Sequence, residues 1–118
     1  MSTQPEELRA RTKQFALRIV RLFKSLPRSS EAFILGKQLL RSGTAVAANY
    51  RAVCRARSKP EFVARMGVVV EEADETVFWI EMLGDAGVMP RSRLESLLAE
   101  ANELLAIFAA SHRTARAR

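Results

Sequence analysis

The sequence has almost none of the residues on which disulfide frameworks, metal centres and most active sites are built. Its 118 residues include one cysteine, Cys54, and one histidine, His112. A single thiol excludes an intrachain disulfide, and its Ala/Val-rich surroundings are typical of a small buried hydrophobe in a reducing compartment. Metal sites in four-helix proteins use Glu-x-x-His pairs, and no glutamate lies three residues before His112. We therefore expect no metal and no cofactor.

Long apolar runs and catalytic motifs are also missing. No stretch approaches the roughly 18 apolar residues that a membrane span needs. The opening MSTQPEELRART lacks the apolar run of a signal peptide. The sequence contains neither a G-x-S-x-G motif nor a glycine-rich phosphate loop. We therefore expect a cytoplasmic protein that is not an enzyme and does not enter the membrane.

The apolar residues that are present follow a helical period. They recur three and four positions apart throughout, and nothing alternates with period two. The short connections between the segments force neighbouring helices to be antiparallel. The sequence therefore predicts an all-α fold, an antiparallel up-down-up-down four-helix bundle forming a single domain over residues 1–118. Its helices are expected at about residues 6–26, 31–56, 59–83 and 90–112, before a basic tail, 113–118, that frays.

The clearest boundary precedes the third helix. Ser58 is placed to act as N-cap and Glu61 as the N3 residue of a capping box, with Pro60 in the first turn. In the helix before this boundary, Ser42 and Asn49 interrupt the apolar seam, and several neighbours are small enough to let helices approach closely. We expect Asn49 to be largely buried and hydrogen-bonded, which would fix the register of the helices.

The third helix has a second apolar face. Val70 and Val77 lie on one flank of its seam, and Phe78 and Trp79 lie on the other. A helix that is apolar beyond one stripe is either central in a core or part of an interface, and no helix of a small bundle is fully surrounded. We expect these four residues to contact another subunit of a homo-oligomer. The alternative is that Trp79 only broadens the core of the single chain.

The net charge of +6 is unevenly distributed. Residues 61–90 contain seven acidic side chains and one basic one, whereas the rest of the chain is basic. A basic cluster ends the second helix, where Arg51 and Arg55 share a face. Clustered arginines are typical of phosphate contact. The candidate nucleic-acid-binding residues are Arg41, Arg51, Arg55, Arg57 and Lys59.

The same cations have two structural explanations. Cations near the end of a helix interact favourably with its macrodipole. They can also pair with Glu71, Glu72 and Glu75 of the acidic third helix, within one subunit or between subunits. If the arginines project freely, nucleic-acid binding is favoured; if they are paired, a protein–protein assembly role is favoured.

Residues 39–83 combine several motifs of one known family. They have a Leu-Arg-Ser opening, a small-residue stretch ending in Asn49, an Arg-Ser-Lys run before Glu61-Phe62, and a Glu-rich helix. In these motifs the chain resembles the bacterial four-helix bundle family, also called the 23S rRNA intervening-sequence protein family. Many members have Ile-Ala-Glu-Gly after the asparagine, where this chain has Tyr50-Arg51-Ala52-Val53. The matching positions are Leu40, Arg41, Ser42, Asn49, Arg57, Ser58, Lys59, Glu61, Phe62, Glu72 and Glu75.

The resemblance implies a bundle that assembles into a homopentamer and has no established activity. It also implies a likeness to the accessory variability protein of diversity-generating retroelements, which binds nucleic acid and a reverse transcriptase through a basic surface. By this analogy of fold we expect a non-enzymatic, oligomeric nucleic-acid-binding or accessory scaffold. Its partners would be itself, RNA or DNA, and a nucleic-acid enzyme such as a reverse transcriptase. The alternative is a protein–protein assembly module that binds no nucleic acid.

Overall fold

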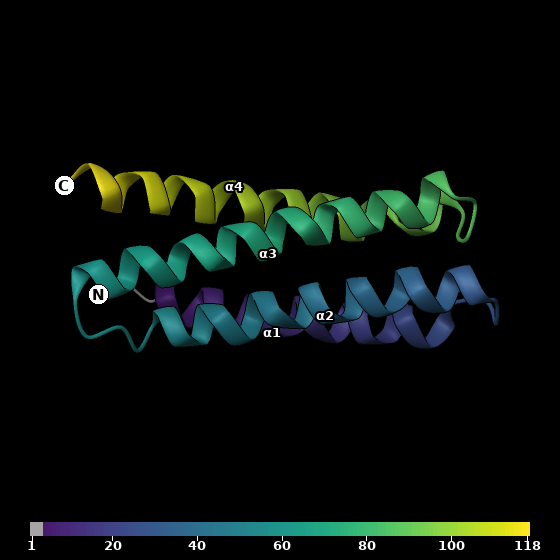
Figure 1. Cartoon of the computed structure of the whole chain (residues 1–118), viewed down its shortest axis with the longest axis horizontal. Helices are drawn as coiled ribbons and strands as arrows, with labels where there is room; N and C mark the ends of the chain where they lie inside the picture. The colour runs from purple at the N-terminus through teal and green to yellow at the C-terminus, as the bar shows by residue number, and fades with distance from the viewer. Residues whose placement is uncertain (1–3) are drawn as a thin grey trace.

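The computed structural model describes residues 4–118, which fold into four antiparallel helices without any strand (Figure 1). Each helix follows its predecessor through a short connection, so the predicted all-α four-helix bundle is confirmed. The described elements are α1 (Gln4–Ser25), α2 (Ser30–Val53), α3 (Lys59–Asp85), a 3₁₀ turn η1 (Arg91–Arg93) and α4 (Glu95–Ala117).

Serine side chains cap the two central helices. The Ser29 side chain accepts a hydrogen bond from the Ala32 backbone N–H at 3.2 Å, at the start of α2. Ser58 accepts from the Glu61 N–H at 3.1 Å, at the start of α3. The Glu61 carboxylate accepts from the Arg57 N–H at 3.0 Å, one residue before the position that an ideal capping box would use. The predicted cap of α3 is therefore present.

The end of the predicted second helix and both ends of the predicted fourth helix need correction. Helix α2 ends at Val53 rather than residue 56, because the last amides bond three residues back, as from Ala56 N–H to the Val53 carbonyl at 3.0 Å. Pro90 opens only the short turn η1, and α4 begins at Glu95. The tail that was expected to fray is helical through Ala117.

The core lies between the apolar stripes of all four helices. Its largest fully buried side chains include Phe15 and Ile19 of α1, Leu39 of α2, Ile80 of α3 and Phe108 of α4. Helices α1 and α2 approach closely at two glycines. A Cβ added at Gly43 would lie 2.8 Å from Ile19 Cγ1, and one added at Gly36 would lie 2.6 Å from Leu26 Cδ1. The small residues of the second helix thus permit the contact that was predicted from them.

Polar side chains also lie along the α2–α3 seam. Thr76 Oγ1 lies 3.0 Å from Ser42 Oγ, and both side chains are fully buried, so the two helices share a buried hydrogen bond. Asn49 was expected to be largely buried, but it is half-buried. Its amide Nδ2 donates to the Ala45 carbonyl at 2.9 Å. Because that bond stays within α2, Ser42 and Thr76, rather than Asn49, link the two helices.

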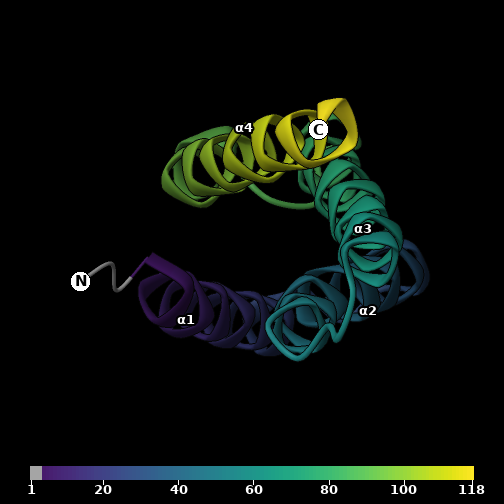
Figure 2. The same cartoon turned by 90° about the vertical axis from the view of Figure 1, so that its left-hand side faces the viewer.

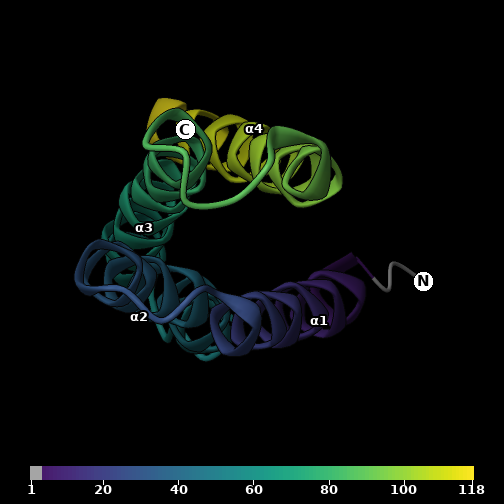
Figure 3. The same ribbon diagram turned by 90° about the vertical axis from the view of Figure 1, so that its right-hand side faces the viewer.

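The four helices form an open arc rather than a closed square (Figures 2 and 3). Each helix packs mainly against its neighbour in the sequence, and α1 has little contact with α4. Ion pairs close that seam: the Arg11 guanidinium lies 2.8 Å from Glu100 and 2.6 Å from Glu103. An apolar cavity of about 850 Å³ lies where the start of α1 faces the end of α4, and Leu8 and Phe108 help to line it.

Candidate nucleic-acid interface

Arg41 is paired with the acidic face of α3. Its guanidinium lies 2.6 Å from Glu75 and 3.3 Å from Glu72, on the outside of the α2–α3 seam. The hydrogen bond to Glu75 is the main reason that the pKa of Arg41 lies above its ordinary value. Arg41 also lies about 15 Å along the helix from Arg51. It therefore satisfies the expected pairing with α3 and is separate from the basic cluster at the end of α2.

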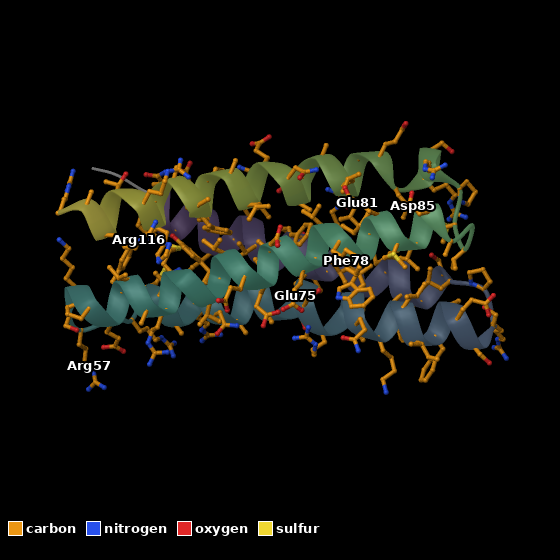
Figure 4. The ribbon with its side chains drawn as sticks, turned by 45° about the horizontal axis from the view of Figure 1, so that its top comes forward. Arg57, Glu75, Phe78, Glu81, Asp85 and Arg116 are labelled. Carbon is orange, nitrogen blue, oxygen red and sulfur yellow. The ribbon has the colours of Figure 1, made fainter. Side chains whose placement is uncertain are left out.

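Three candidate cations remain unpaired. Arg51, Arg55 and Arg57 are exposed, and none of them forms a side-chain ion pair with any residue between 4 and 118. Figure 4 shows the Arg57 side chain extending away from the bundle. Lys59 differs, because its ammonium donates to the backbone carbonyl of Arg118 at the end of α4. The structure thus places Arg51, Arg55 and Arg57 together and turns Lys59 toward another helix.

A groove of about 610 Å³ brings α1 to the same cluster. Arg9 and Lys13 of α1 line one side, and Arg51 and Arg55 line the other, with Glu6 as the one carboxylate among the lining residues. Arg9 and Lys13 have no ion pair within the part of the chain that the structure describes. Arg9 and Lys13 are four residues apart, so the sequence alone shows that they share one face of α1. Only the packing of α1 shows that this face borders α2.

A second groove, of about 440 Å³, lies between the end of α2 and the start of α3. Arg51 and Arg55 line it as well, together with Arg57 and Arg65. Arg65 Nε donates to Glu61 at 2.8 Å, so this cation is already neutralised. The bond from the Arg57 backbone N–H is the main reason that the pKa of Glu61 lies below its ordinary value, followed by the bond from Arg65. The cations that line these two grooves without an ion pair to any described residue are named here the basic ridge: Arg9, Lys13, Arg51, Arg55 and Arg57.

The residues predicted to meet another subunit occupy different environments. Val77 is 9% exposed and belongs to the core of the single chain. It lies two turns before Gly84, where an added Cβ would lie 3.4 Å from Leu94 Cδ1, next to the start of α4. It therefore packs within the subunit, which the interface prediction did not anticipate. Val70 and Trp79 are half-buried against the core. Phe78 is 49% exposed and packs edge-on against Trp79, with ring centroids 4.8 Å apart.

The outer face of α3 combines this exposed ring with negative charge. Figure 4 shows Glu75, Phe78, Glu81 and Asp85 along the second half of the helix. Glu81, with Glu71 and Asp74, forms no ion pair with any of the described residues. The buried Trp79 Nε1 has no hydrogen-bond partner within residues 4–118. An orphaned buried donor of this kind costs about 1–3 kcal/mol.

Within 4–118, no three His, Cys, Asp or Glu side chains are grouped so that they could hold a metal ion. None of the helices in that range is long and apolar enough to cross a membrane. His112 is half-buried on α4, with its imidazole against Gly67 of α3.

The comparisons with known proteins agree with this architecture. The sequence profile of the family described as 23S rRNA-intervening sequence protein matches residues 7–110. A crystal structure of a protein of unknown function from the S23 ribosomal protein family of Bacteroides thetaiotaomicron superposes with a TM-score of 0.85 and 30% identity. That alignment covers 92% of this chain and 97% of the other. No curated protein matches the sequence. The match over residues 7–110 shows that this chain belongs to the 23S rRNA-intervening sequence protein family.

Proposed function

We propose that this protein is a non-enzymatic, oligomeric scaffold that binds nucleic acid through the basic ridge. The observation that supports this function is that Arg51 and Arg55, at and just after the end of α2, have no ion pair with any of residues 4–118, whereas Arg41, earlier in α2, is paired. Like charges that gather on one surface repel each other, and phosphate groups relieve that repulsion. Residues from two helices and the connection after α2 converge on this surface, which therefore suits a polyanion.

The oligomer in this proposal is supported by the outer face of α2 and α3. Arg41 pairs with Glu75, so the face of α2 that carries Arg41 lies next to the face of α3 that carries Glu75. Ile34 lies seven residues, or two turns, before Arg41 on the same face of α2, and Met82 lies seven residues after Glu75 on the same face of α3. Because the two helices are antiparallel, both steps lead toward the same end of the bundle, so Ile34 and Met82 lie near each other. With Phe78 they form an outer apolar patch, in which Ile34 is 60% exposed and Phe78 49%. A second copy of the chain would cover it.

Assembly also addresses the weakness of a small cation cluster. The five cations of the basic ridge on one subunit are few for tight binding at physiological salt. A ring repeats them on every subunit, and linked sites can raise avidity by about 10²-fold or more. A pentamer, and a nucleic-acid enzyme such as a reverse transcriptase as protein partner, belong to this proposal through likeness of fold alone.

The test is binding of RNA and DNA by wild-type protein at several salt concentrations, measured by fluorescence anisotropy. The variant with Arg51→Gln, Arg55→Gln and Arg57→Gln should lose binding while keeping its helicity and its assembly. Arg41→Gln is the matched control, because it removes one cation that is already paired and should leave binding unchanged. Absence of binding by wild-type protein at low salt contradicts the proposal.

A protein–protein assembly module is the second candidate, favoured by the unpaired acids Glu71, Asp74 and Glu81. These acids on one face and the basic ridge on another make the molecule complementary to a second copy of itself. Such unlike faces meet head to tail, which gives a ring where the rotation between subunits closes and a filament where it does not. If the triple arginine variant fails to assemble, the ridge holds subunits together and this function replaces the first.

A further inference from the structure

The last turns of α2 stand between two groups of cations. Helix α2 lies at a corner of the arc, with α1 on one side and α3 on the other (Figures 2 and 3). Arg9 and Lys13 border the groove toward α1, and Arg57 borders the groove toward α3. Arg51 and Arg55 line both grooves. The basic ridge therefore surrounds the end of α2, with positive charge toward α1 on one flank and toward α3 on the other.

The width of this arrangement suits a duplex. An α-helix with its side chains is about 10–12 Å across. The major groove of B-form DNA is about 12 Å wide and is bordered by two phosphate backbones. Cations on the two flanks of one inserted helix would each face one backbone. A single strand presents only one row of phosphates, which engages one flank.

The surface also lacks the groups that hold single strands. Proteins that bind single-stranded nucleic acid stack its bases on exposed aromatic rings. No aromatic residue lines either basic groove. Of the aromatic rings in residues 4–118, the exposed ones are Phe33 and Phe78, and Phe33 lies about 27 Å along α2 from Arg51. Tyr50, beside Arg51 in the sequence, is 5% exposed and packs against Phe108 in the core.

No lining residue of this surface is suited to reading adenine, and the arginines and lysine, which can also bond guanine, are assigned here to phosphates. Between the flanks, α2 presents Ala48 and Ala52, whose methyl groups allow close approach but form no hydrogen bonds. The amide of Asn49 already donates to the Ala45 carbonyl. Asparagine and glutamine are the residues that read adenine, and neither lines the two grooves.

We propose that the ligand of the basic ridge is double-stranded DNA, with α2 lying in the major groove and the two flanks contacting opposite phosphate backbones, without selection of sequence. This inference rests on the proposed function and adds the substrate class to it. The ligand is recognised by its two phosphate rows and by a groove wide enough for a helix. Duplex RNA has the same charges, but its major groove is too narrow to admit one.

The first experiment compares four probes with full-length protein at low salt: two DNA duplexes of unrelated sequence and about two helical turns, an RNA duplex and an oligo-dT strand of the same length. The two DNA duplexes should bind alike, and both about 10-fold or more tighter than the RNA duplex and oligo-dT. Equal or tighter binding of oligo-dT or of the RNA duplex overturns the inference and leaves the proposed function intact. A large difference between the two DNA sequences also overturns it. No binding to any probe overturns both.

The second experiment tests the two flanks separately. The double variant Arg9→Gln/Lys13→Gln and the single variant Arg57→Gln should each reduce the slope of log affinity against log salt, by about 0.9 for every contact removed. Arg41→Gln should leave the slope unchanged. If only one flank affects the slope, the inference that the two flanks contact opposite phosphate backbones is wrong. Each variant should keep its helices, because all of these side chains are exposed, and circular dichroism measures this.

Discussion

At the scale of single residues, two glycines in similar helices have opposite surroundings. A Cβ at Gly43 of α2 would lie 2.8 Å and 3.0 Å from the two γ carbons of Ile19, a fully buried, β-branched side chain that has little freedom to move. A Cβ at Gly67 of α3 would meet only the imidazole of His112, at 3.3 Å, and that ring is half-buried near the end of α4.

Replacing each of these glycines with alanine should change the stability of the protein in opposite directions. Gly43→Ala should lower the free energy of unfolding by about 1–3 kcal/mol, because α1 and α2 must move apart. Gly67→Ala should raise it by about 0.5–1 kcal/mol, because alanine favours the helix and the His112 ring can shift. Urea denaturation of both variants measures the difference. A stabilised Gly43→Ala protein would show that the α1–α2 contact is looser than described.

At the scale of elements, the contact between α1 and α4 depends on charge. Arg11 joins Glu100 and Glu103, and Arg18 adds a hydrogen bond to Ser96 at 2.9 Å. The hydrogen bond from Arg11 is the main reason that the pKa of Glu100 lies below its ordinary value. A carboxylate with a lowered pKa stabilises the folded state above the unfolded-state value of about 4.3. That contribution is lost as the pH falls through the folded-state pKa.

We therefore expect Glu100 to make the bundle acid-sensitive. Stability should fall as the pH drops from about 5 to 3, and Glu100→Gln should remove about 0.5 kcal/mol of that dependence. Urea unfolding at neutral and acid pH measures both proteins. Glu95→Gln is the matched control, because Glu95 is exposed on the same helix and has no ion pair with the described residues. An unchanged pH profile in Glu100→Gln would rule out this role.

The sequence was most informative about elements and least informative about how they rotate against one another. Ser58 and the apolar periods predict the helices, because caps and periods are local. That Arg9 and Lys13 join the arginines of α2 depends on how α1 is turned about its axis, which only packing determines. That Val77 is buried within the single chain could not be foreseen for the same reason, since two flanks of one helix look alike until the packing of the neighbouring helices is known.

At the scale of the whole molecule, the outer apolar patch of Ile34, Phe78 and Met82 should be covered by a second copy of the chain. We expect an assembly larger than one 13.2 kDa chain at micromolar concentration, measured by light scattering. Phe78→Ser should dissociate it with little effect on the fold, because the ring is 49% exposed in the single chain. Val77→Ala is the contrasting variant: it should weaken folding, by about 1–3 kcal/mol, without acting on the contact directly. A wild-type species of one chain would contradict the oligomer.

The open arc has a consequence for the way the chain folds. Each helix is packed mostly against the helix before or after it, while the first and last scarcely touch. Contacts between sequence neighbours close short loops, and proteins dominated by them fold in microseconds to milliseconds. An outer helix held on one side also opens at lower free energy than an inner one. Transient detachment of α1 or α4, rather than global unfolding, would then expose the interior to proteases.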